Sequence, residues 1–462
     1  MPLPTTFAGD SARGEGLFSS VVSLGGNYWS ATLTGTYSSP QDSANSIKVD
    51  SSGNIYVAGR GTYDSGGSAN QLSVSKYNSS GVIQWQKTFS SSVNVSTGLG
   101  LDIDSSGNVY VCGQENVFPF LQLITKWDNS GTFQWARNLT DTYKAPVDFA
   151  CGVAVDSSGN VYVCGYGLDS NGFLVQSISK WNTSGTLQWQ RTLKDAQSSS
   201  NSTALGIYVD SSGNVYISGY GAINSTGTQT IISISKWNNS GTLQWQRTLT
   251  DPSSGPTAEG TSITLDSSGN IYVCGFGLDS SLYNVLSISK WNNSGTIQWQ
   301  SSLRDTYSTP LTKGYGVAVD SSGNVYACGT GKNSSGQSVM SISKWDNSGS
   351  ILLQRTITST PSNQANAITV DTSGNMYVAG YIKNNAGNQV MSISKLPTDG
   401  SRTGTYTGST FGITYATSSW TASTTSWTAA TSTWATATST FTVSTSAGTS
   451  GTSTYATDKV TI

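Results

Sequence analysis

The sequence predicts an all-β fold, because one short motif and the strand-like segments around it recur along most of the chain. The motif is Asp-Ser-Ser-Gly-Asn or Asp-Thr-Ser-Gly-Asn, and its seven copies start 51 to 56 residues apart, at Asp50, Asp104, Asp156, Asp210, Asp266, Asp320 and Asp371. Glycine at the fourth position supplies the positive φ of a tight turn. Each copy follows an apolar alternation and precedes a second β-rich run. We therefore expect it to join strands A and B of a hairpin.

A second hairpin is expected in every unit. Strand C ends in Ile-Ser-Lys-Trp or a variant, a Gly-containing turn follows, and strand D contains a Gln-Trp-Gln-like run, as around Trp299. Four short antiparallel strands per repeat are typical of a propeller blade. The sequence therefore predicts a seven-bladed β-propeller of four-stranded blades.

The seventh unit is split between distant parts of the chain. Its strand C ends at Lys395 and the repeat pattern then stops, so this unit lacks a D strand. Residues 28–34 instead align with the D strand at residues 244–250. We expect residues 27–34 to pair antiparallel with the strand that ends at Lys395, to bury Trp29 and to close the ring. Closure also removes an open sheet edge.

The repeat resembles a known family. Asp-Ser-Ser-Gly-Asn-(Val/Ile)-Tyr-Val-x-Gly, followed by Lys-Trp-(Asn/Asp)-x-Ser-Gly-Thr-(Leu/Ile)-Gln-Trp-Gln, is similar to the SBBP-type repeat of bacterial seven-bladed β-propellers over residues 27–400. It looks specifically like versions in virion structural proteins of marine and cyanobacterial phages, where such units precede a Ser/Thr-rich tail. This resemblance implies a virion role.

Two segments flank the propeller, which is expected at residues 27–402. Residues 1–26 form an N-terminal arm, expected to be either a disordered tail or an arm that docks on a neighbouring subunit. Residues 403–462 are expected to be an attachment or oligomerisation segment. Within it, residues 403–457 contain no charged side chain, and aromatic residues recur every seventh position at Trp420, Trp427, Trp434 and Phe441.

This seven-residue period has more than one interpretation. It matches a coiled-coil seam, but the Ser and Thr between the aromatic residues disfavour a helix. We expect short β-segments with turns or an intertwined oligomeric stalk, with a mucin-like disordered tail as the alternative. Each large ring needs a partner surface. The propeller flank could supply it, although sister copies or neighbouring virion proteins are the favoured partners.

Composition argues against several classes of function. Only 10% of residues are charged and the net charge is −2, so no basic field is present to bind nucleic acid. Histidine is absent, which removes the commonest general base and transition-metal ligand. No apolar stretch is long enough to span a membrane, and the N-terminus lacks the apolar core of a signal peptide. We expect no cofactor and no metal.

Residues that carry chemistry repeat from blade to blade, which favours structural roles. Buried free thiols are expected at a strand-B position that Ala or Ser fills in other blades, at Cys112, Cys164, Cys274 and Cys328. One Asp per turn fits an Asx turn better than a calcium loop. The D-strand tryptophans are expected to cover the gaps between blades, with the strand-C lysine extended over them. Repeated acids single out no catalytic pair, so we expect no enzymatic activity.

The two faces of the disc are expected to differ. The A–B and C–D turns are short and nearly constant, whereas the B–C and D–A loops vary and emerge on the opposite face, where binding sites are common. Aromatic residues in neutral surroundings suit sugar stacking or protein contact. The candidate binding residues are Tyr63, Phe118, Phe120, Tyr143, Tyr166, Phe173, Phe276, Tyr283, Tyr307 and Tyr381.

The predicted function is that of a non-enzymatic phage virion structural protein, in a tail fibre, baseplate-associated or head-decoration role. Its partners would be other virion proteins or sister copies, through residues 1–26 and 403–462, and a glycan or protein of the host surface. Its location would be the virion. The alternatives are a bacterial extracellular or cell-surface propeller that binds a glycan or protein, and a propeller hydrolase or lyase.

Overall fold

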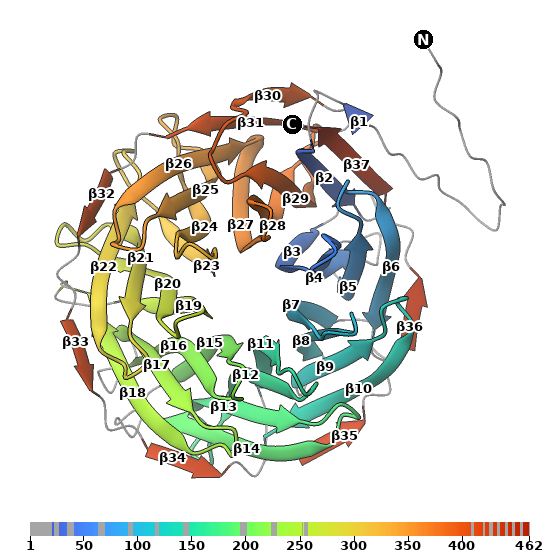
Figure 1. Cartoon of the computed structure of the whole chain (residues 1–462), viewed down its shortest axis with the longest axis vertical. Helices are drawn as coiled ribbons and strands as arrows, with labels where there is room; N and C mark the ends of the chain where they lie inside the picture. Colours follow the sequence, from blue (N-terminus) through green and yellow to red (C-terminus); the bar gives the residue numbers. More distant parts are fainter. Residues whose placement is uncertain are drawn as a thin grey trace.

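Seven β-sheets stand in a ring around a central channel in the computed structural model (Figure 1). The structure describes residues 21–22, 27–34, 41–62, 70–90, 96–115, 120–141, 147–194, 201–222, 229–251, 253, 257–407, 411–418, 421–424, 428–431, 435–438, 442–445, 449–452 and 456–461. Within these ranges every regular element is a strand, and no helix could cross a membrane. The all-β, seven-bladed propeller is therefore confirmed.

Each blade contains strands A to D in order from the channel outward. The first three blades are β3 (Ser43–Val49), β4 (Ile55–Thr62), β5 (Asn70–Tyr77) and β6 (Ile83–Ser90); β7 (Ser96–Ile103), β8 (Val109–Glu115), β9 (Leu121–Trp127) and β10 (Phe133–Thr140); and β11 (Phe149–Val155), β12 (Val161–Leu168), β13 (Leu174–Trp181) and β14 (Leu187–Lys194). Blades 4 and 5 are β15 (Ser202–Val209), β16 (Val215–Ala222), β17 (Thr230–Trp237) and β18 (Leu243–Thr250), and β19 (Glu259–Leu265), β20 (Ile271–Leu278), β21 (Asn284–Trp291) and β22 (Ile297–Arg304). Blade 6 is β23 (Lys313–Val319), β24 (Val325–Lys332), β25 (Ser338–Trp345) and β26 (Ile351–Thr358).

Blade 7 is assembled from both parts of the chain that the sequence predicted. Its strands A to C are β27 (Thr360–Val370), β28 (Asn375–Lys383) and β29 (Gln389–Pro397), and its D strand is β2 (Trp29–Thr34). The strands β2 and β29 pair antiparallel, with Trp29 opposite Lys395. Trp29 is 1% exposed, whereas the equivalent Trp245 of blade 4 is only half-buried. The predicted closure is confirmed, and the closing tryptophan is buried more deeply than its counterpart.

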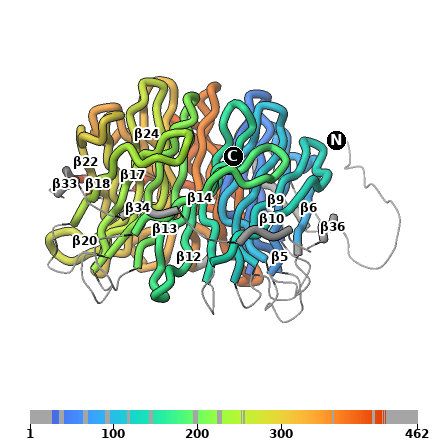
Figure 2. Tube along the Cα trace, turned by 90° about the horizontal axis from the view of Figure 1, so that it is seen from below, coloured from blue at the N-terminus to red at the C-terminus, as the bar shows by residue number. Residues whose placement is uncertain are grey.

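The strands of the C-terminal segment lie around the rim of the ring, which Figure 2 shows from its edge, and add a strand to every blade (Figure 1). These strands visit the blades in the order 6, 5, 4, 3, 2, 1 and 7, and each pairs antiparallel with a D strand. They are β31 (Gly412–Thr417), β32 (Thr421–Thr424), β33 (Thr428–Thr431), β34 (Ala435–Thr438), β35 (Thr442–Thr445), β36 (Thr449–Thr452) and β37 (Ala456–Thr461). We call β31 to β37 the rim belt.

The belt is held at its two ends. At blade 6, β30 (Gly404–Thr407) forms a hairpin with β31. The intervening Phe411 and the β31 side chains of Ile413 and Tyr415 are buried in the core there. At blade 7, β37 lies between β2 and the short parallel strand β1 (Val21–Val22). Both segments that flank the propeller therefore meet at the blade that closes the ring.

The belt explains the seven-residue period in the sequence. From β32 to β37 each strand begins seven residues after the one before it, so one period serves one blade. Among the described residues this segment forms short β-strands, which agrees with one of the two expected conformations. The backbone of these strands pairs with the D strands of the propeller's own rim. Trp420, Trp427, Trp434 and Phe441 lie outside the described residues, as do residues 1–20 of the arm. An assembly role of either segment stays a prediction.

A glycine in strand B allows strand A to bulge in every blade. In blade 3 the register shifts between Ala150 and Gly152, opposite Gly165. A Cβ atom at Gly165 would lie 1.8 Å from the carbonyl oxygen of Phe149, so only glycine fits there. The bulge leaves one extra strand-A residue per blade, and in all seven blades that residue lines the channel.

Candidate binding face

The A–B turns build one face of the disc from a repeated hydrogen-bond pattern. In blade 1 the Asp50 carboxylate accepts the backbone N–H groups of Ser52 and Asn54 and the Asn54 side-chain amide. Gly53 follows with φ of 77°. All seven motif copies make the same contacts, so the motif is an Asx turn, as expected. We call this side the turn face.

The same face contains a contact that joins neighbouring blades. The Tyr162 hydroxyl of β12 lies 3.0 Å from the Asp156 carboxylate in its own turn and 2.9 Å from the side-chain oxygen of Asn239 in the C–D turn of the next blade, so it can donate to either. The ammonium of Lys180 also bonds to the Asn239 side chain. Trp189 of strand D donates its Nε1–H to the Asn239 carbonyl at 3.0 Å. A single turn residue thus receives three side chains from the preceding blade.

The tryptophan cover differs in detail from the expectation. The strand-C lysine lies over the strand-B tyrosine, as Lys180 does 5.1 Å from the centre of the Tyr162 ring. The strand-D arginine is the cation that lies over the tryptophan, as Arg191 does 5.6 Å from the Trp189 ring centre. The tryptophans do reach across to the next blade, but the lysine was assigned to the wrong ring. The reason is that Lys180 pairs directly with Tyr162 across strands B and C.

The cysteines fill tight positions between blades. All five are free thiols, and the four in strand B are buried. A Cβ atom at Gly314 of blade 6 would lie 2.5 Å from the sulfur of Cys274 of blade 5, which shows how closely the next blade approaches this position. Burial raises the pKa of the Cys274 thiol to about 12, so this thiol stays protonated and unreactive at neutral pH. Small size, the expected requirement, is what this position demands.

The opposite side of the disc, which we call the loop face, contains the aromatic candidates. Tyr63, Phe118 and Tyr143 lie outside the described residues. The Tyr166 ring stacks on Phe149 with their centres 4.9 Å apart, and the Phe120 ring is tilted against Phe149 at 6.0 Å, so these three rings form one group. Phe276 is 7% exposed between Tyr315 and the Lys313 ammonium, which leaves little of its ring accessible.

The other candidates keep more accessible surface, although a cation covers one ring face in three of them. Lys194, Arg304 and Lys332 lie over Phe173, Tyr283 and Tyr307 at 5.2, 5.6 and 5.1 Å. Tyr283 is 39% exposed, whereas Phe173, Tyr307 and Tyr381 are half-buried. The candidates therefore form several small groups around the disc. They do not converge on one site.

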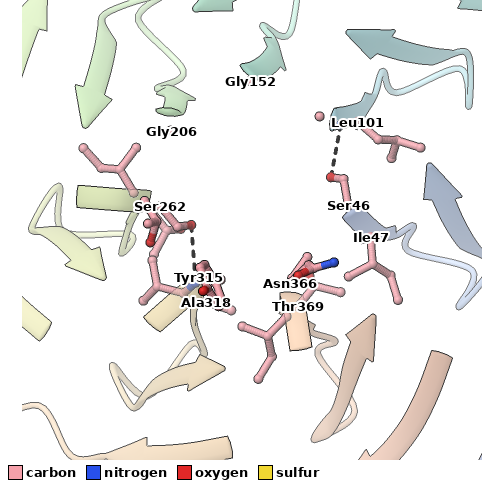
Figure 3. A pocket seen from close by; sticks show the side chains of 18 of the residues that line it. Ser46, Ile47, Leu101, Gly152, Gly206, Ser262, Tyr315, Ala318, Asn366 and Thr369 are labelled. Atoms are coloured by element: carbon pink, nitrogen blue, oxygen red, sulfur yellow. Dashed lines mark hydrogen bonds between the residues drawn. The ribbon is translucent and has the colours of Figure 1, made fainter. Parts of the chain in front are cut away.

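The central channel contains a cavity of about 260 Å³ lined by the A strands of all seven blades (Figure 3). Ser46 and Ser262 link neighbouring A strands there by accepting the N–H groups of Leu101 and Val317. The Asn366 side chain donates to the Ala44 carbonyl of blade 1 at 2.9 Å. Ser46, Ser262 and Asn366, which Figure 3 labels in the channel, thus join blades to one another.

Two charged residues in the channel interrupt the repeat of uncharged side chains. Lys48 of blade 1 forms an ion pair with Asp102 of blade 2 at 3.1 Å, and Asp102 also accepts the Val155 N–H of blade 3. The Asp102 charge raises the pKa of Lys48, and burial raises the pKa of Tyr208, which lies near both charges. A raised pKa keeps Tyr208 protonated and unfit as a base. These residues were not among the candidates predicted from the sequence, although a charged side chain in each of these two A strands was a signal for them.

The described residues offer no metal centre, because none of their His, Cys, Asp and Glu side chains form a group of three that could hold an ion. Two buried carboxylates do meet at the junction of blades 2 and 3. Asp148 is fully buried and accepts the Asp141 N–H at 2.7 Å through Oδ2, while its Oδ1 has no hydrogen-bond partner. Burial raises the pKa of Asp148, and the nearby Asp141 carboxylate adds to this rise.

We expect Asp148→Asn to stabilise the protein at neutral and higher pH. Folding takes up a proton at Asp148 between its ordinary pKa and its raised folded pKa, so wild-type stability falls as pH rises through that interval. Asn363 stands at the same place in blade 7 and is 1% exposed, so asparagine fits. The unfolding free energy should rise by about 1–3 kcal/mol at pH 8 and much less at pH 4. Denaturant titrations at several pH values would measure this difference.

Asp251→Asn is the matched control for that substitution. Asp251 accepts the N–H groups of Thr257 and Leu278, and Ala258 stands where blade 3 has the second carboxylate. Its substitution should lower stability at both pH values. An Asp148→Asn variant that is less stable than wild type at pH 8 would contradict the account of the carboxylate pair.

Comparison with known proteins finds a family model that matches parts of three blades and the closing strand. A model described as SBBP: Beta-propeller repeat matches residues 29–64, 144–173 and 307–335. These stretches include the closing strand β2 and parts of blades 1, 3 and 6. The matches and the ring together support the β-propeller family. No curated protein matches the sequence.

Solved structures of similar shape are distant from this propeller. They include the polysaccharide lyase Uly1, with a TM-score of 0.44 and 10% identity over 77% of this chain and 90% of that one. A protein of unknown function from Dyadobacter fermentans has a TM-score of 0.42 and 12% identity over 82% and 98% of the two chains. Another, from Bacteroides caccae, has a TM-score of 0.33 and 10% identity over 59% and 93%. These likenesses carry no argument about activity.

Proposed function

We propose that the protein is a non-enzymatic binding and structural protein that presents the loop face of its propeller to a partner. The observation that carries this proposal is the difference between the two faces. On the turn face, Tyr, Lys and Trp side chains repeat with the blades and bond to the next blade, so their polar groups are occupied. On the loop face, the residues at corresponding places differ from blade to blade. A variable surface on a rigid scaffold suits recognition.

We further propose that the protein is a phage virion structural protein, in a tail fibre, baseplate-associated or head-decoration role, and that the loop face contacts the host surface. The resemblance of the repeats and of the following Ser/Thr-rich segment to virion propellers supports this role. The rim belt supports it physically, because a strand on every blade covers sheet edges that would otherwise pair with other chains. The proposed location is the virion, and the proposed partners are other virion proteins and a host-surface molecule.

Blocking one face at a time tests the proposal. We would introduce one exposed cysteine in a Cys151→Ser background, by Ser335→Cys on the loop face or Ser267→Cys on the turn face, and couple polyethylene glycol to it. The fluorescent full-length protein should bind whole cells of at least one strain in a panel of marine bacteria and cyanobacteria. The polymer on the loop face should abolish binding, and the polymer on the turn face should not.

Two results would contradict this function. Binding that is blocked only from the turn face would assign recognition to the wrong side of the disc. Absence of binding to every strain would remove the host-surface role. For the virion role, antibodies against the full chain should label particles of phages that infect the bound strain, and unlabelled particles would count against it.

A further inference from the structure

One turn on the loop face carries a strained, exposed leucine. Leu282 lies in the turn between β20 and β21 with φ of 63°, a left-handed conformation that side chains other than glycine rarely adopt. The corresponding turns of blades 3, 6 and 7 contain Gly172, Gly336 and Gly387, with φ of 83°, 76° and 81°. The backbone bonds are the same, because Leu282 donates to Asp279 as Gly172 donates to Asp169. Blade 5 thus keeps the turn and replaces its glycine.

The leucine gains no burial that would offset this strain. Its side chain is 60% exposed, and its neighbour Tyr283 is 39% exposed. Leu311, in the loop that leads into blade 6, is 37% exposed and lies beside this turn, because its backbone bridges to Asn284. We call Leu282, Tyr283 and Leu311 the blade 5 knob. A left-handed leucine costs roughly 1–2 kcal/mol, and exposed apolar groups add nothing to folding. Backbone strain that no packing or burial offsets is typical of functional sites.

We propose that the blade 5 knob docks into an apolar socket on a partner protein, and this inference rests on the proposed binding role of the loop face. Leu282 lies at the tip of a turn and projects from the surface, whereas sites for small molecules and sugars are concave. An aliphatic side chain offers nothing to the hydroxyl groups of a glycan. A protein socket buries it, as apolar and aromatic anchors are buried at the centre of protein interfaces.

The charges around the knob indicate which charge the partner should carry at the edge of that socket. Arg304 covers one face of Tyr283 and is neutralised by an ion pair with Asp279 at 2.6 Å. Lys332 bonds to the carbonyl and hydroxyl oxygens of Thr309, which carry no charge. The adjacent Asp305 carboxylate is buried and accepts the N–H groups of Leu311 and Lys332, so the Lys332 ammonium is the charge left exposed there. A carboxylate beside the socket would complement it. A second copy fits poorly, because it would present the same cation and another projecting leucine.

The first test needs no partner. Leu282→Gly removes the strain and the exposed side chain together, so its melting temperature should rise by about 1–3 °C. The reciprocal control is Gly387→Leu in blade 7, where a Cβ atom would meet nothing within 4 Å. That substitution should lower the melting temperature by a similar amount. A lower melting temperature for Leu282→Gly would show that Leu282 stabilises the fold, and would overturn the inference.

The second test uses intact cells of the bacterial strain that the full-length protein binds best. Leu282→Gly should weaken binding at least tenfold, and the double variant with Gly387→Leu should not restore it. Protease treatment of the cells should abolish wild-type binding, whereas periodate oxidation of their glycans should not. Binding that periodate abolishes and Leu282→Gly leaves unchanged would overturn the protein socket but keep the loop face as a binding surface.

Two further results would also overturn the inference. One is binding of the wild-type protein, but not of Leu282→Gly, to vesicles of phosphatidylcholine and phosphatidylglycerol, which would make a lipid surface the occupant. The other is concentration-dependent self-association that Leu282→Gly removes, which would make it a second copy. If the wild-type protein binds none of the bacterial strains, the proposed function itself fails, and this inference fails with it.

Discussion

Replacing Trp29 with alanine should lower the free energy of unfolding by about 3–5 kcal/mol, the usual cost of deleting a buried tryptophan from a core. Trp29 is 1% exposed and packs in one core cluster with Ile47 of blade 1 and Met391 of blade 7. A Cβ atom at Gly81 in blade 1 would lie 2.6 Å from its ring, so the fit is tight. Strand β2 lies far in sequence from the other strands of blade 7, so only noncovalent contacts such as those of Trp29 hold it in that blade. Denaturant unfolding followed by circular dichroism would measure it.

Two matched variants separate ring closure from the general loss of a tryptophan. Trp245→Ala removes a half-buried ring from a blade whose four strands are continuous in sequence, so its effect should be smaller. Trp29→Phe keeps a large ring in the same place and should recover much of the lost stability. An equal loss for Trp29→Ala and Trp245→Ala would show that the closing position has no special weight.

Deleting residues 419–462 should produce large associated species that the full-length protein does not form. The deletion removes β32 to β37 and uncovers the D-strand edges of six blades, while β31 still covers blade 6. The net gain of about 0.5–1.5 kcal/mol per ladder hydrogen bond nearly cancels the cost of about 1–2 kcal/mol for ordering each residue. We therefore expect a modest change in melting temperature but strong association through the exposed edges. Light scattering against concentration would detect it.

The control for this deletion preserves the strands but alters their order. Exchanging residues 421–424 with residues 435–438 should leave the protein monomeric, because backbone pairing tolerates either sequence in either place. Replacing residues 419–462 with a Gly/Ser chain of equal length should associate as the deletion does. A deletion variant that stays monomeric at high concentration would show that the belt does not protect the edges.

Local repetition made the blades predictable from the sequence. The Asp-Ser-Ser-Gly-Asn turn, the strand alternation and the D-like segment around Trp29 depend on interactions among neighbouring residues or between repeated positions. Seven copies of the motif therefore gave the number of blades, and the missing D strand identified residues 27–34 as its replacement. The paired register of Trp29 with Lys395 agrees with that prediction.

The candidate binding residues show that the sequence did not predict which side chains are exposed. Phe276 and Tyr283 are both aromatic residues at the loop side of blade 5, yet one is 7% and the other 39% exposed. The difference depends on Lys313 and Tyr315 of the next blade, which cover Phe276. Leu282 could have been noticed as the residue that replaces glycine in a repeated turn, but its exposure required the fold. Exposure is a property of neighbours that lie far away in sequence.

The rim belt is an example of what the sequence determined and of what only the tertiary structure decided. The sequence alone determined seven blades, a split seventh blade and a seven-residue period after residue 403, because these are patterns along the chain. The same period could serve a coiled-coil seam, a stalk or a row of β-segments. Only the ring decided among them: each blade presents the edge of its D strand at the rim, and four residues of one period pair with that edge. The spacing of these edges is set by how the blades pack around the channel, a distance that no stretch of local sequence encodes.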